Sequence, residues 1–321
     1  MRILVTGANG FIGRHLCALL LARGHEVGAA VRRPGTAPAG CVEILVGDLS
    51  ADTQWHDVLA CYESVVHMSA RVHIMDDTSS DPLADFRSVN TEGTRRLAKA
   101  AAEQGVARFV FLSSIKVNGE ATNGRPFTAG SALAPADPYG VSKMEAELAL
   151  WREIRDTTMT AVVVRTPLVF GPGVKGNFIR MLAITAKRIP LPLGSVKNRR
   201  SMVSVWNLTD LIERAAGEPD AAGTTIVAAD AFSPSTPQLL RELSKAMRLQ
   251  PRIIKLPVAM MRVAGVLTGK SGVVQRLVSS LEVEPGSSSS SWSWTPALSF
   301  QEGIQRTVDW YVNEHKESTK K

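Results

Sequence analysis

Short apolar runs alternate with stretches of helical periodicity along the first half of the chain. The runs that predict strands lie at residues 2–6, 26–31, 42–46, 64–67, 108–113 and 161–165. Apolar residues spaced three and four apart predict helices near 12–23, 52–60, 83–104 and 139–155. This alternation is typical of an α/β fold, a doubly wound parallel sheet with helices on both faces. Strand order 3-2-1-4-5-6 would place a ligand crevice at the carboxyl ends of the strands.

The pattern changes after about residue 170, where glycine and proline interrupt the chain. Helices are predicted at 239–247, 258–267 and 273–281. Residues 258–267 form the longest apolar stretch, too short to cross a membrane, so we expect a buried helix there. These features predict a smaller, loop-rich lid domain.

The domain boundaries are set by these changes. We assign a dinucleotide-binding domain to residues 1–170 with about 200–230, and a substrate-binding lid to 171–199 and 231–316. Residues 317–321 are expected to be a disordered tail. The serine run 287–291 is expected to be an exposed loop.

Composition excludes several classes of protein. The 321 residues are 45% hydrophobic and carry a net charge of +7. Lys and Arg are scattered and aromatics are few, so we expect no nucleic-acid partner. Without an apolar run of about 18 residues or a signal peptide, we expect a cytoplasmic protein with no membrane insertion. Three cysteines without metal spacing fit a reducing compartment and predict no metal site.

A glycine triplet joins the first predicted strand to the first helix. Gly7 permits a tight turn, Gly10 lets a diphosphate approach the backbone, and Gly13 lets strand and helix pack closely. The helix N-terminus adds free N–H groups and the positive end of a dipole. We therefore expect a dinucleotide to contact this turn, through Gly7, Asn9, Gly10, Phe11, Ile12 and Gly13.

Tyr139 and Lys143 lie four residues apart in a predicted helix and so share one face. A tyrosine exchanges protons near pH 7 only if its pKa falls by about three units from about 10. A nearby lysine ammonium and a cationic nicotinamide ring favour the phenolate. Ser114, at the end of the fifth strand, can bond the same substrate oxygen. This set beside a dinucleotide predicts hydride transfer at a carbon that bears oxygen.

The second strand indicates which dinucleotide binds. Binders of NAD usually carry an acidic residue about 20 residues beyond the glycines, but here Arg32 and Arg33 follow Val31. Two guanidinium groups suit a 2′-phosphate, so NADP(H) is favoured and NAD(H) remains possible. The alternative is a solvated basic turn.

Taken in order, these motifs resemble the extended short-chain dehydrogenase/reductases, and within them the nucleotide-sugar epimerase/dehydratase branch. The resemblance rests on the glycine triplet, Asp48-Leu49, Ser114, the Tyr139–Lys143 pair and residues 165–173. It implies a Rossmann-type fold with a substrate lid, and a homodimer formed through helices 91–105 and 139–155. Helix residue Asn90 is either part of this family pattern or a buried structural amide.

The resemblance also implies further contacts. Asp48 and Leu49 are expected at the adenine, Lys143 at the nicotinamide ribose, and Pro167 at the carboxamide. Ser69 and Ala70 are expected at the cofactor as well. A nucleotide sugar, UDP-linked or similar, would be held by Ser114 and by Lys116, Asn177, Arg200 and Arg276. His15, His67 and His73 are expected to be structural.

The two residues after Ser114 narrow the reaction. The branch's dehydratases carry an Asp-Glu pair there, whereas this chain has Ile115-Lys116, which disfavours dehydration. Residues 113–120 and 173–178 look like a bacterial surface-polysaccharide (O-antigen) subgroup that contains 4-reductases of UDP-4-keto-6-deoxy-N-acetylhexosamines. We expect such an NADPH-dependent reductase, with a nucleotide-sugar 4-epimerase as the alternative. A non-catalytic dinucleotide sensor is disfavoured because Ser114, Tyr139 and Lys143 are all present.

Overall fold

The computed structural model describes residues 1–72 and 80–318, so His73 lies outside the described residues. Within them, eight strands form one sheet in the order β10-β9-β6-β5-β4-β1-β2-β3. The predicted order of the first six strands is confirmed, and β9 and β10 extend the sheet beyond β6. The strands are β1 Arg2–Thr6, β2 Glu26–Val31, β3 Val42–Leu45, β4 Ser64–His67, β5 Arg108–Ser114, β6 Thr160–Thr166, β9 Thr224–Val227 and β10 Gly286–Ser287. All neighbours pair in parallel except β10, which runs antiparallel to β9.

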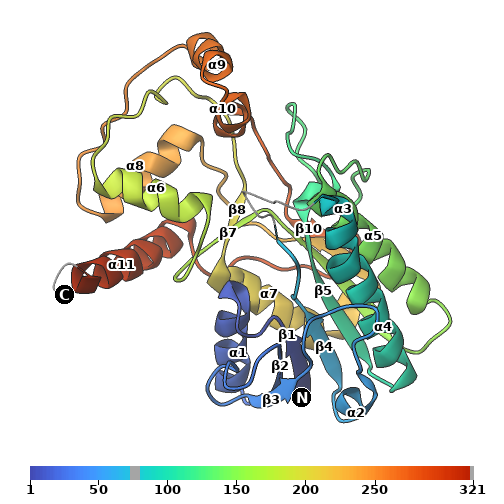
Figure 1. Cartoon of the computed structure of the whole chain (residues 1–321). Coiled ribbons are helices and arrows are strands. Elements are labelled where there is room, and N and C mark those ends of the chain that lie inside the picture. The colour runs from blue at the N-terminus through green and yellow to red at the C-terminus, as the bar shows by residue number, and fades with distance from the viewer. Residues whose placement is uncertain (73–79, 319–321) are drawn as a thin grey trace.

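Helices cover both faces of this sheet, as predicted (Figure 1). Side chains alternate along β1: Ile3 and Val5 pack with α1 and α7, whereas Leu4 packs with α4 and α5. The helices of these layers are α1 Phe11–Ala22, α2 His56–Leu59, α3 Pro82–Phe86, α4 Gly93–Glu103, α5 Pro138–Glu153 and α7 Val205–Gly217. The single helix predicted over 83–104 contains a π-helical turn at Arg87–Glu92, between α3 and α4.

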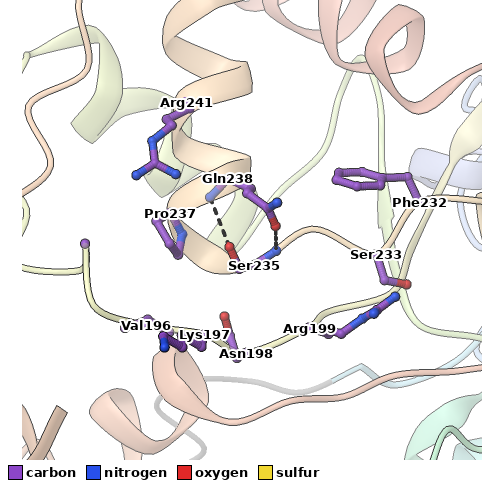
Figure 2. A pocket seen from close by; sticks show the side chains of 11 residues that line it. Val196, Lys197, Asn198, Arg199, Phe232, Ser233, Ser235, Pro237, Gln238 and Arg241 are labelled. Atoms are coloured by element: carbon purple, nitrogen blue, oxygen red, sulfur yellow. Dashed lines mark hydrogen bonds between the residues drawn. The ribbon is translucent and has the colours of Figure 1, made fainter.

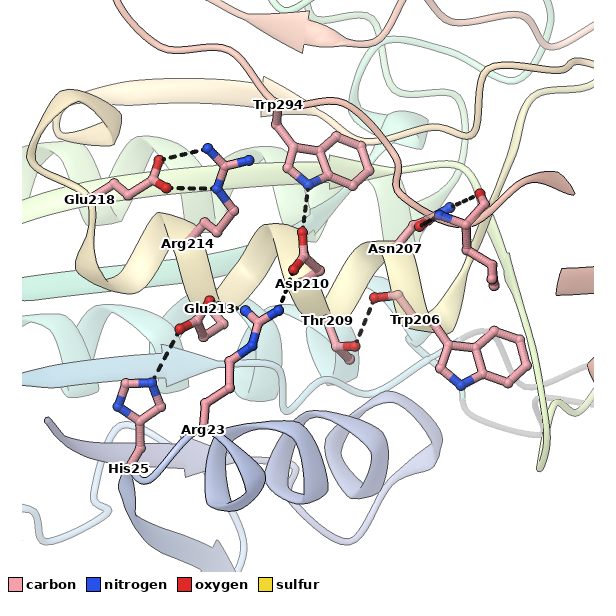
Figure 3. Close-up of polar contacts among 11 residues, drawn as sticks. Arg23, His25, Trp206, Asn207, Thr209, Asp210, Glu213, Arg214, Glu218 and Trp294 are labelled. Carbon is pink, nitrogen blue, oxygen red and sulfur yellow. Dashed lines mark hydrogen bonds and ion pairs between the residues drawn. The ribbon is translucent and has the colours of Figure 1, made fainter. Parts of the chain in front are cut away.

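Charged residues join α1 to α7 (Figure 3). Arg23 donates to Asp210 at 2.6 Å and also pairs with Glu213, while His25 contacts Glu213 at 3.2 Å. The indole N–H of Trp294 donates to Asp210 at 3.0 Å. The predicted range 200–230 therefore includes a helix and a strand that are integral to the sheet domain.

The lid has a core of its own. A two-stranded parallel sheet of β7 (Leu168–Phe170) and β8 (Met202–Ser204) leads into it. Phe170, Phe178, Leu239 and Phe300 are among the buried residues that form its core. Its helices are α6 Asn177–Ala186, α8 Thr236–Ala246, α9 Val258–Leu267, α10 Ser271–Val278 and α11 Phe300–Ser318.

Two parts of the range predicted for the lid and tail differ from expectation. Ser287 lies in β10, the Ser288 hydroxyl accepts the N–H of Thr225 at 3.0 Å, and Trp292 is buried in the core of the sheet domain. The serine run is therefore only partly an exposed loop. Residues 317 and 318 of the predicted tail belong to α11, and 319–321 lie outside the described residues.

The prediction of a buried helix at 258–267 is wrong. In α9 only Met261 and Gly265 are buried, and the side chain of Leu267 is 81% exposed. The spacing of apolar residues predicts the helix, but it does not indicate whether another element packs over its apolar side chains. Over the residues that the structure describes, no helix combines the length and apolar character needed to cross a membrane.

Candidate active site

The turn between β1 and α1 forms a cradle for a diphosphate. Gly7 has φ +70°, a conformation that favours glycine. A Cβ on Gly13 would lie 2.1 Å from the Gly7 carbonyl oxygen, so only glycine lets helix and strand approach this closely. Among the described residues no side chain caps α1 at Gly10, so the N–H groups of its first turn can donate to an anionic ligand. These residues fit the diphosphate of a dinucleotide.

The carboxyl end of β2 presents two cations beside this cradle. Arg32 and Arg33 are exposed, and Arg32 Nη1 lies 3.3 Å from Asp48 Oδ1 in an ion pair open to solvent. The Glu43 carboxylate accepts the backbone N–H groups of residues 35, 36 and 37 at 3.0–3.2 Å, which fixes the turn behind them. The hydrogen bonds also lower the pKa of Glu43. This end of the sheet fits an anionic group on the adenosine half of a dinucleotide.

The end of β4 completes the cradle. The Thr6 hydroxyl accepts the N–H groups of Met68 and Ser69 at 3.2 Å, and the Ser69 nitrogen lies 3.0 Å from the position of a Cβ on Gly7. Ala70 comes next in the chain and is half-buried. Leu49 lies on the loop that follows β3 and is buried against the start of α4.

His67 lies under this end of β4 and is structural, as predicted. Its Nδ1 is 2.6 Å from the Thr6 hydroxyl and its Nε2 is 3.0 Å from the Thr94 hydroxyl. Because the Thr94 hydroxyl donates its own hydrogen to the Asn90 carbonyl, it accepts a hydrogen bond from the N–H at Nε2. Burial lowers the pKa of His67 to about 3, so the ring stays neutral. His15, in α1, contacts the Pro172 carbonyl oxygen at 2.9 Å.

Ser114 and Tyr139 meet at the carboxyl end of β5. Ser114 ends the strand, and Tyr139 begins α5, whose first turn is capped by Asp137 through the N–H of Gly140 at 2.7 Å. The Phe86 ring packs edge-on against Tyr139, with centroids 6.0 Å apart. Burial and the Asp137 charge raise the pKa of Tyr139 to about 12, while a hydrogen bond with Ser114 opposes this. In the protein alone, the expected lowering of this pKa is therefore absent.

Lys143 lies one turn after Tyr139 on α5 and is almost completely buried, with 1% of its surface exposed. Its Nζ is 3.9 Å from the centroid of the Phe111 ring on β5. Burial lowers its pKa to about 7, and the nearby Glu147 carboxylate opposes that shift. The lysine therefore titrates near neutral pH.

The buried charges behind this lysine were not predicted from the sequence. Arg165 Nη2 donates to Glu147 Oε2 at 2.7 Å, and the Ser113 hydroxyl donates to Glu147 Oε1 at 2.5 Å. Arg165 also reaches Asn118 Oδ1 at 3.4 Å. The network ties α5 to β5 and β6 beneath the site. The one indication of this network in the sequence is Glu147, which lies four residues after Lys143 on the same face of the predicted helix.

Asn90 lies in the π-helical turn and is fully buried. Of the two alternatives for this residue, the structure agrees with the buried structural amide. Its Oδ1 accepts the N–H of Arg71 at 2.8 Å, and its Nδ2 donates to the Arg71 carbonyl at 3.0 Å and to the Ser142 hydroxyl at 2.9 Å. It therefore fixes the loop after β4 against α5.

The predicted substrate residues are spread over the site and the lid. Lys116 pairs with Asp137 and with Glu120 (2.9 Å), which raises the pKa of its ammonium. Asn177 is exposed at the start of α6, and Pro167 is buried between β6 and β7. Arg200 Nη1 donates to the carbonyls of Arg276 and Ser279 at 2.9 and 3.2 Å, and burial lowers its pKa. The Arg276 side chain itself is exposed on α10.

Two cavities lie apart from the Ser114–Tyr139 pair. One of about 410 Å³ is bordered by residues 194–199 and the start of α8, where Ser235 and Gln238 form a capping box (Figure 2). The other, of about 490 Å³, lies between α1 and α7. Neither is lined by Ser114, Tyr139 or Lys143.

Comparisons with known proteins match this chain in sequence and in fold. A model of the NAD dependent epimerase/dehydratase family matches residues 3–229. UDP-glucose 4-epimerase of Vibrio cholerae is 40% identical over 313 residues, which cover 97% of this chain and 95% of the relative. The UDP-glucose 4-epimerase of Thermotoga maritima, solved with UDP-glucose, superimposes with a TM-score of 0.77 at 19% identity, covering 98% of this chain and 100% of that one. The Thermus thermophilus UDP-glucose 4-epimerase complex with NAD gives 0.73 at 25% identity, covering 97% and 99%.

Proposed function

The chain belongs to the NAD-dependent epimerase/dehydratase family, and within that family we propose that it is a 4-epimerase of UDP-linked sugars. The observation that carries the proposal is the meeting of Ser114 and Tyr139 at the carboxyl end of β5, with Lys143 one turn further along α5 and over the Phe111 ring of the same strand. The Vibrio cholerae relative, similar over nearly its whole length, supports epimerisation over the reduction expected from sequence.

Each catalytic residue has a definite task in this reaction. A bound nicotinamide dinucleotide supplies reversible hydride transfer at carbon 4 of the sugar. Tyr139 removes the proton of the 4-hydroxyl and later returns it. Ser114 holds the same oxygen in position. Lys143, when charged, stabilises the Tyr139 phenolate and lowers the high pKa that burial imposes on the phenol.

For cofactor binding we assign the diphosphate to the cradle of residues 7–13 and the adenine to Asp48 and Leu49. Ser69, Ala70, Tyr139, Lys143 and Pro167 would line the nicotinamide half. Arg32 and Arg33 are exposed and favour a 2′-phosphate, so NADP(H) is the preferred cofactor, with NAD(H) also accepted.

For substrate binding we assign the diphosphate of the UDP-sugar to Arg200 and Asn177. The exposed Arg276 is a further cation that we assign to the same diphosphate. Lys116 stays a predicted sugar contact, and we give it a second role in positioning Tyr139. Because its ammonium pairs with Asp137, the N-cap of α5, it positions the turn that carries Tyr139.

A second candidate function is NADPH-dependent reduction of a UDP-linked 4-keto sugar, for surface polysaccharide (O-antigen) synthesis. Arg32 and Arg33 are the observation that favours it, because a net reduction draws on the cellular NADPH pool. The same three catalytic residues would serve it, with Tyr139 donating the proton to O4.

Assembly and location also belong to this proposal. We assign a cytoplasmic homodimer that pairs through α4 and α5, where Leu148 is exposed on α5. Chemical cross-linking and analytical ultracentrifugation test the dimer, and Leu148→Glu should weaken it.

The experiment that tests the function offers the enzyme UDP-glucose and UDP-N-acetylglucosamine and follows proton NMR at carbon 4, with absorbance at 340 nm in parallel. The 4-epimer should appear without net change in reduced cofactor. No epimer, together with stoichiometric NADPH oxidation by a UDP-4-keto-6-deoxy-N-acetylhexosamine, would overturn the epimerase in favour of the reductase.

A further inference from the structure

Helices α9 and α10 project from the lid at the opposite end of the molecule from the N-terminus (Figure 1). Only one side of this hairpin is covered. Met261 of α9 and Val274 of α10 pack in a second apolar cluster of the lid, with Leu193, Val196 and Leu240. A Cβ on Gly265 would lie 2.8 Å from Val274 Cγ2, so the two helices pack closely. The hairpin is therefore a well-packed element with a free outer side.

The outer side of the hairpin is apolar. Met260, Val263 and Leu267 succeed one another at three- and four-residue spacing along one face of α9, with exposures of 57%, 60% and 81%. Val266 is 71% exposed beside them. Exposed apolar residues that gather on one element in this way mark a contact surface. We call these four residues the α9 patch.

The charged residues of the segment that carries the α9 patch have one sign. From residue 243 to 281 the sequence contains no Asp or Glu, and its cations are Lys245, Arg248, Arg252, Lys255, Arg262, Lys270 and Arg276. Without these seven, the rest of the chain has equal numbers of acidic and basic residues, so this segment accounts for the whole net charge of +7. Arg262 lies within α9 and Lys270 just beyond it, and both are exposed.

From this juxtaposition we propose that the α9–α10 hairpin binds the surface of an anionic phospholipid bilayer. The α9 patch enters the boundary between headgroups and acyl chains, and Arg262 and Lys270 contact lipid phosphates. Helices with an apolar face and flanking cations lie in the plane of a membrane without crossing it. This inference does not depend on the sugar chemistry proposed above.

Binding to lipid vesicles tests the proposal with the full chain. Vesicles of phosphatidylglycerol and phosphatidylcholine in equal parts, and of phosphatidylcholine alone, are floated with the protein at 50 mM and 500 mM NaCl. The protein should float with the anionic vesicles at low salt. Neutral lipid or high salt should reduce binding strongly, because phosphate contacts are then absent or screened.

Three variants separate the contributions to binding. Met260→Gln/Val263→Gln/Leu267→Gln should lower vesicle partition at least about tenfold, because it removes three apolar side chains from the interface. Arg262→Gln/Lys270→Gln should remove most of the salt dependence. The matched control, Val42→Gln/Leu45→Gln, changes similarly exposed apolar residues on β3 and should bind as the unchanged chain does.

Circular dichroism and thermal melting verify that each variant folds. The proposal is overturned if the unchanged protein does not float with anionic vesicles. It is equally overturned if the triple Gln variant floats as well as the control. If that variant instead only dissociates an oligomer in analytical ultracentrifugation, the α9 patch binds a second copy of the chain and not lipid.

Discussion

The Lys143 ammonium nitrogen lies 3.9 Å from the centroid of the Phe111 ring, so a helix packed on the sheet holds a lysine over an aromatic face of β5. One turn earlier on the same helix stands Tyr139, whose pKa is raised where that of Lys143 is lowered. Compared with the same side chains in water, burial in this site therefore favours the neutral phenol of Tyr139 and the neutral amine of Lys143. Binding of ligands must therefore supply the remaining bias toward phenolate and ammonium.

The lowered pKa of Lys143 predicts a pH-dependent stability. The pKa falls from 10.5 to about 7, so between pH 7 and 9 the unfolded chain holds a proton that the folded chain releases. The free energy of unfolding of the cofactor-free protein should then rise by about 1.4 kcal/mol per pH unit over that window. Lys143→Met should be more stable at pH 7 and lose this slope. Urea denaturation at pH 7, 8 and 9 measures it.

The control for this experiment is Lys99→Met, which changes an exposed lysine on α4. It should keep the slope of the unchanged protein. A slope that persists in Lys143→Met would show that Lys143 does not titrate in this range.

Tyr139→Phe should lower kcat about a thousandfold, because it removes the group that exchanges the proton with O4. Ser114→Ala should have a smaller effect, since Tyr139 still contacts the same oxygen. Initial rates with a UDP-sugar and fluorescence titration with NADPH measure the two properties separately. Dinucleotide affinity should stay within about threefold, since Tyr139 contributes few of the proposed contacts. If Tyr139→Phe kept a tenth of the activity, another residue would be moving the proton.

Arg32→Ala/Arg33→Ala should weaken NADPH binding about thirtyfold, a loss of about 2 kcal/mol from charge-assisted hydrogen bonds to a 2′-phosphate. NADH binding should hardly change, because NADH carries no such phosphate. Isothermal titration calorimetry with both cofactors measures the difference. Arg125→Ala, an exposed arginine in a distant loop, is the control. An equal loss for both cofactors would indicate that the arginines contact another part of the dinucleotide.

Gly13→Ala should abolish dinucleotide binding, because the added Cβ would lie 2.1 Å from the Gly7 carbonyl oxygen and push α1 away from the cradle. Gly272→Ala places the same methyl group near the start of α10, where no atom beyond its chain neighbours and the helix's own backbone lies within 4 Å of it. Differential scanning fluorimetry with and without NADPH compares the two. The ligand-induced rise in Tm should disappear only in Gly13→Ala. A retained rise would contradict the assignment of the cradle.

Sequence alone predicts the sheet domain well, because its strands and helices alternate with clear periodicity and the spacing of its glycine triplet indicates a strand-to-helix turn. Strand β10 could not be predicted, since Gly286–Ser287 has no apolar pattern and pairs only through its backbone. The π-helical turn at Arg87–Glu92 likewise could not be predicted, because the spacing of apolar residues there does not differ from that of an α-helix. Asn90 occupies that turn and bonds a loop nineteen residues away.

The candidate site shows the same division. Motifs identify Ser114, Tyr139 and Lys143, and the structure brings the serine and tyrosine to one strand end. The ion pair between Glu147 and Arg165 could not be predicted from the sequence. Glu147 lies on a helix and Arg165 on a strand, so no fixed spacing along the chain indicates that they meet. Burial raises the pKa of Tyr139 in the protein alone, whereas the lowering predicted from the sequence applies to the site with a charged lysine and a bound cationic nicotinamide ring. The cost of burying a phenolate depends on tertiary packing, which the sequence pattern does not show.

In the proposed epimerisation, hydride leaves carbon 4 of a UDP-sugar and returns to it within one active site. The most direct test supplies UDP-glucose deuterated at carbon 4 and measures the isotope in the product by mass spectrometry and NMR. The expected product is UDP-galactose that keeps its deuterium at carbon 4, with no net change in cofactor and formation about a thousandfold slower in Tyr139→Phe. Loss of deuterium to solvent, or no 4-epimer at all, would contradict the proposed epimerisation.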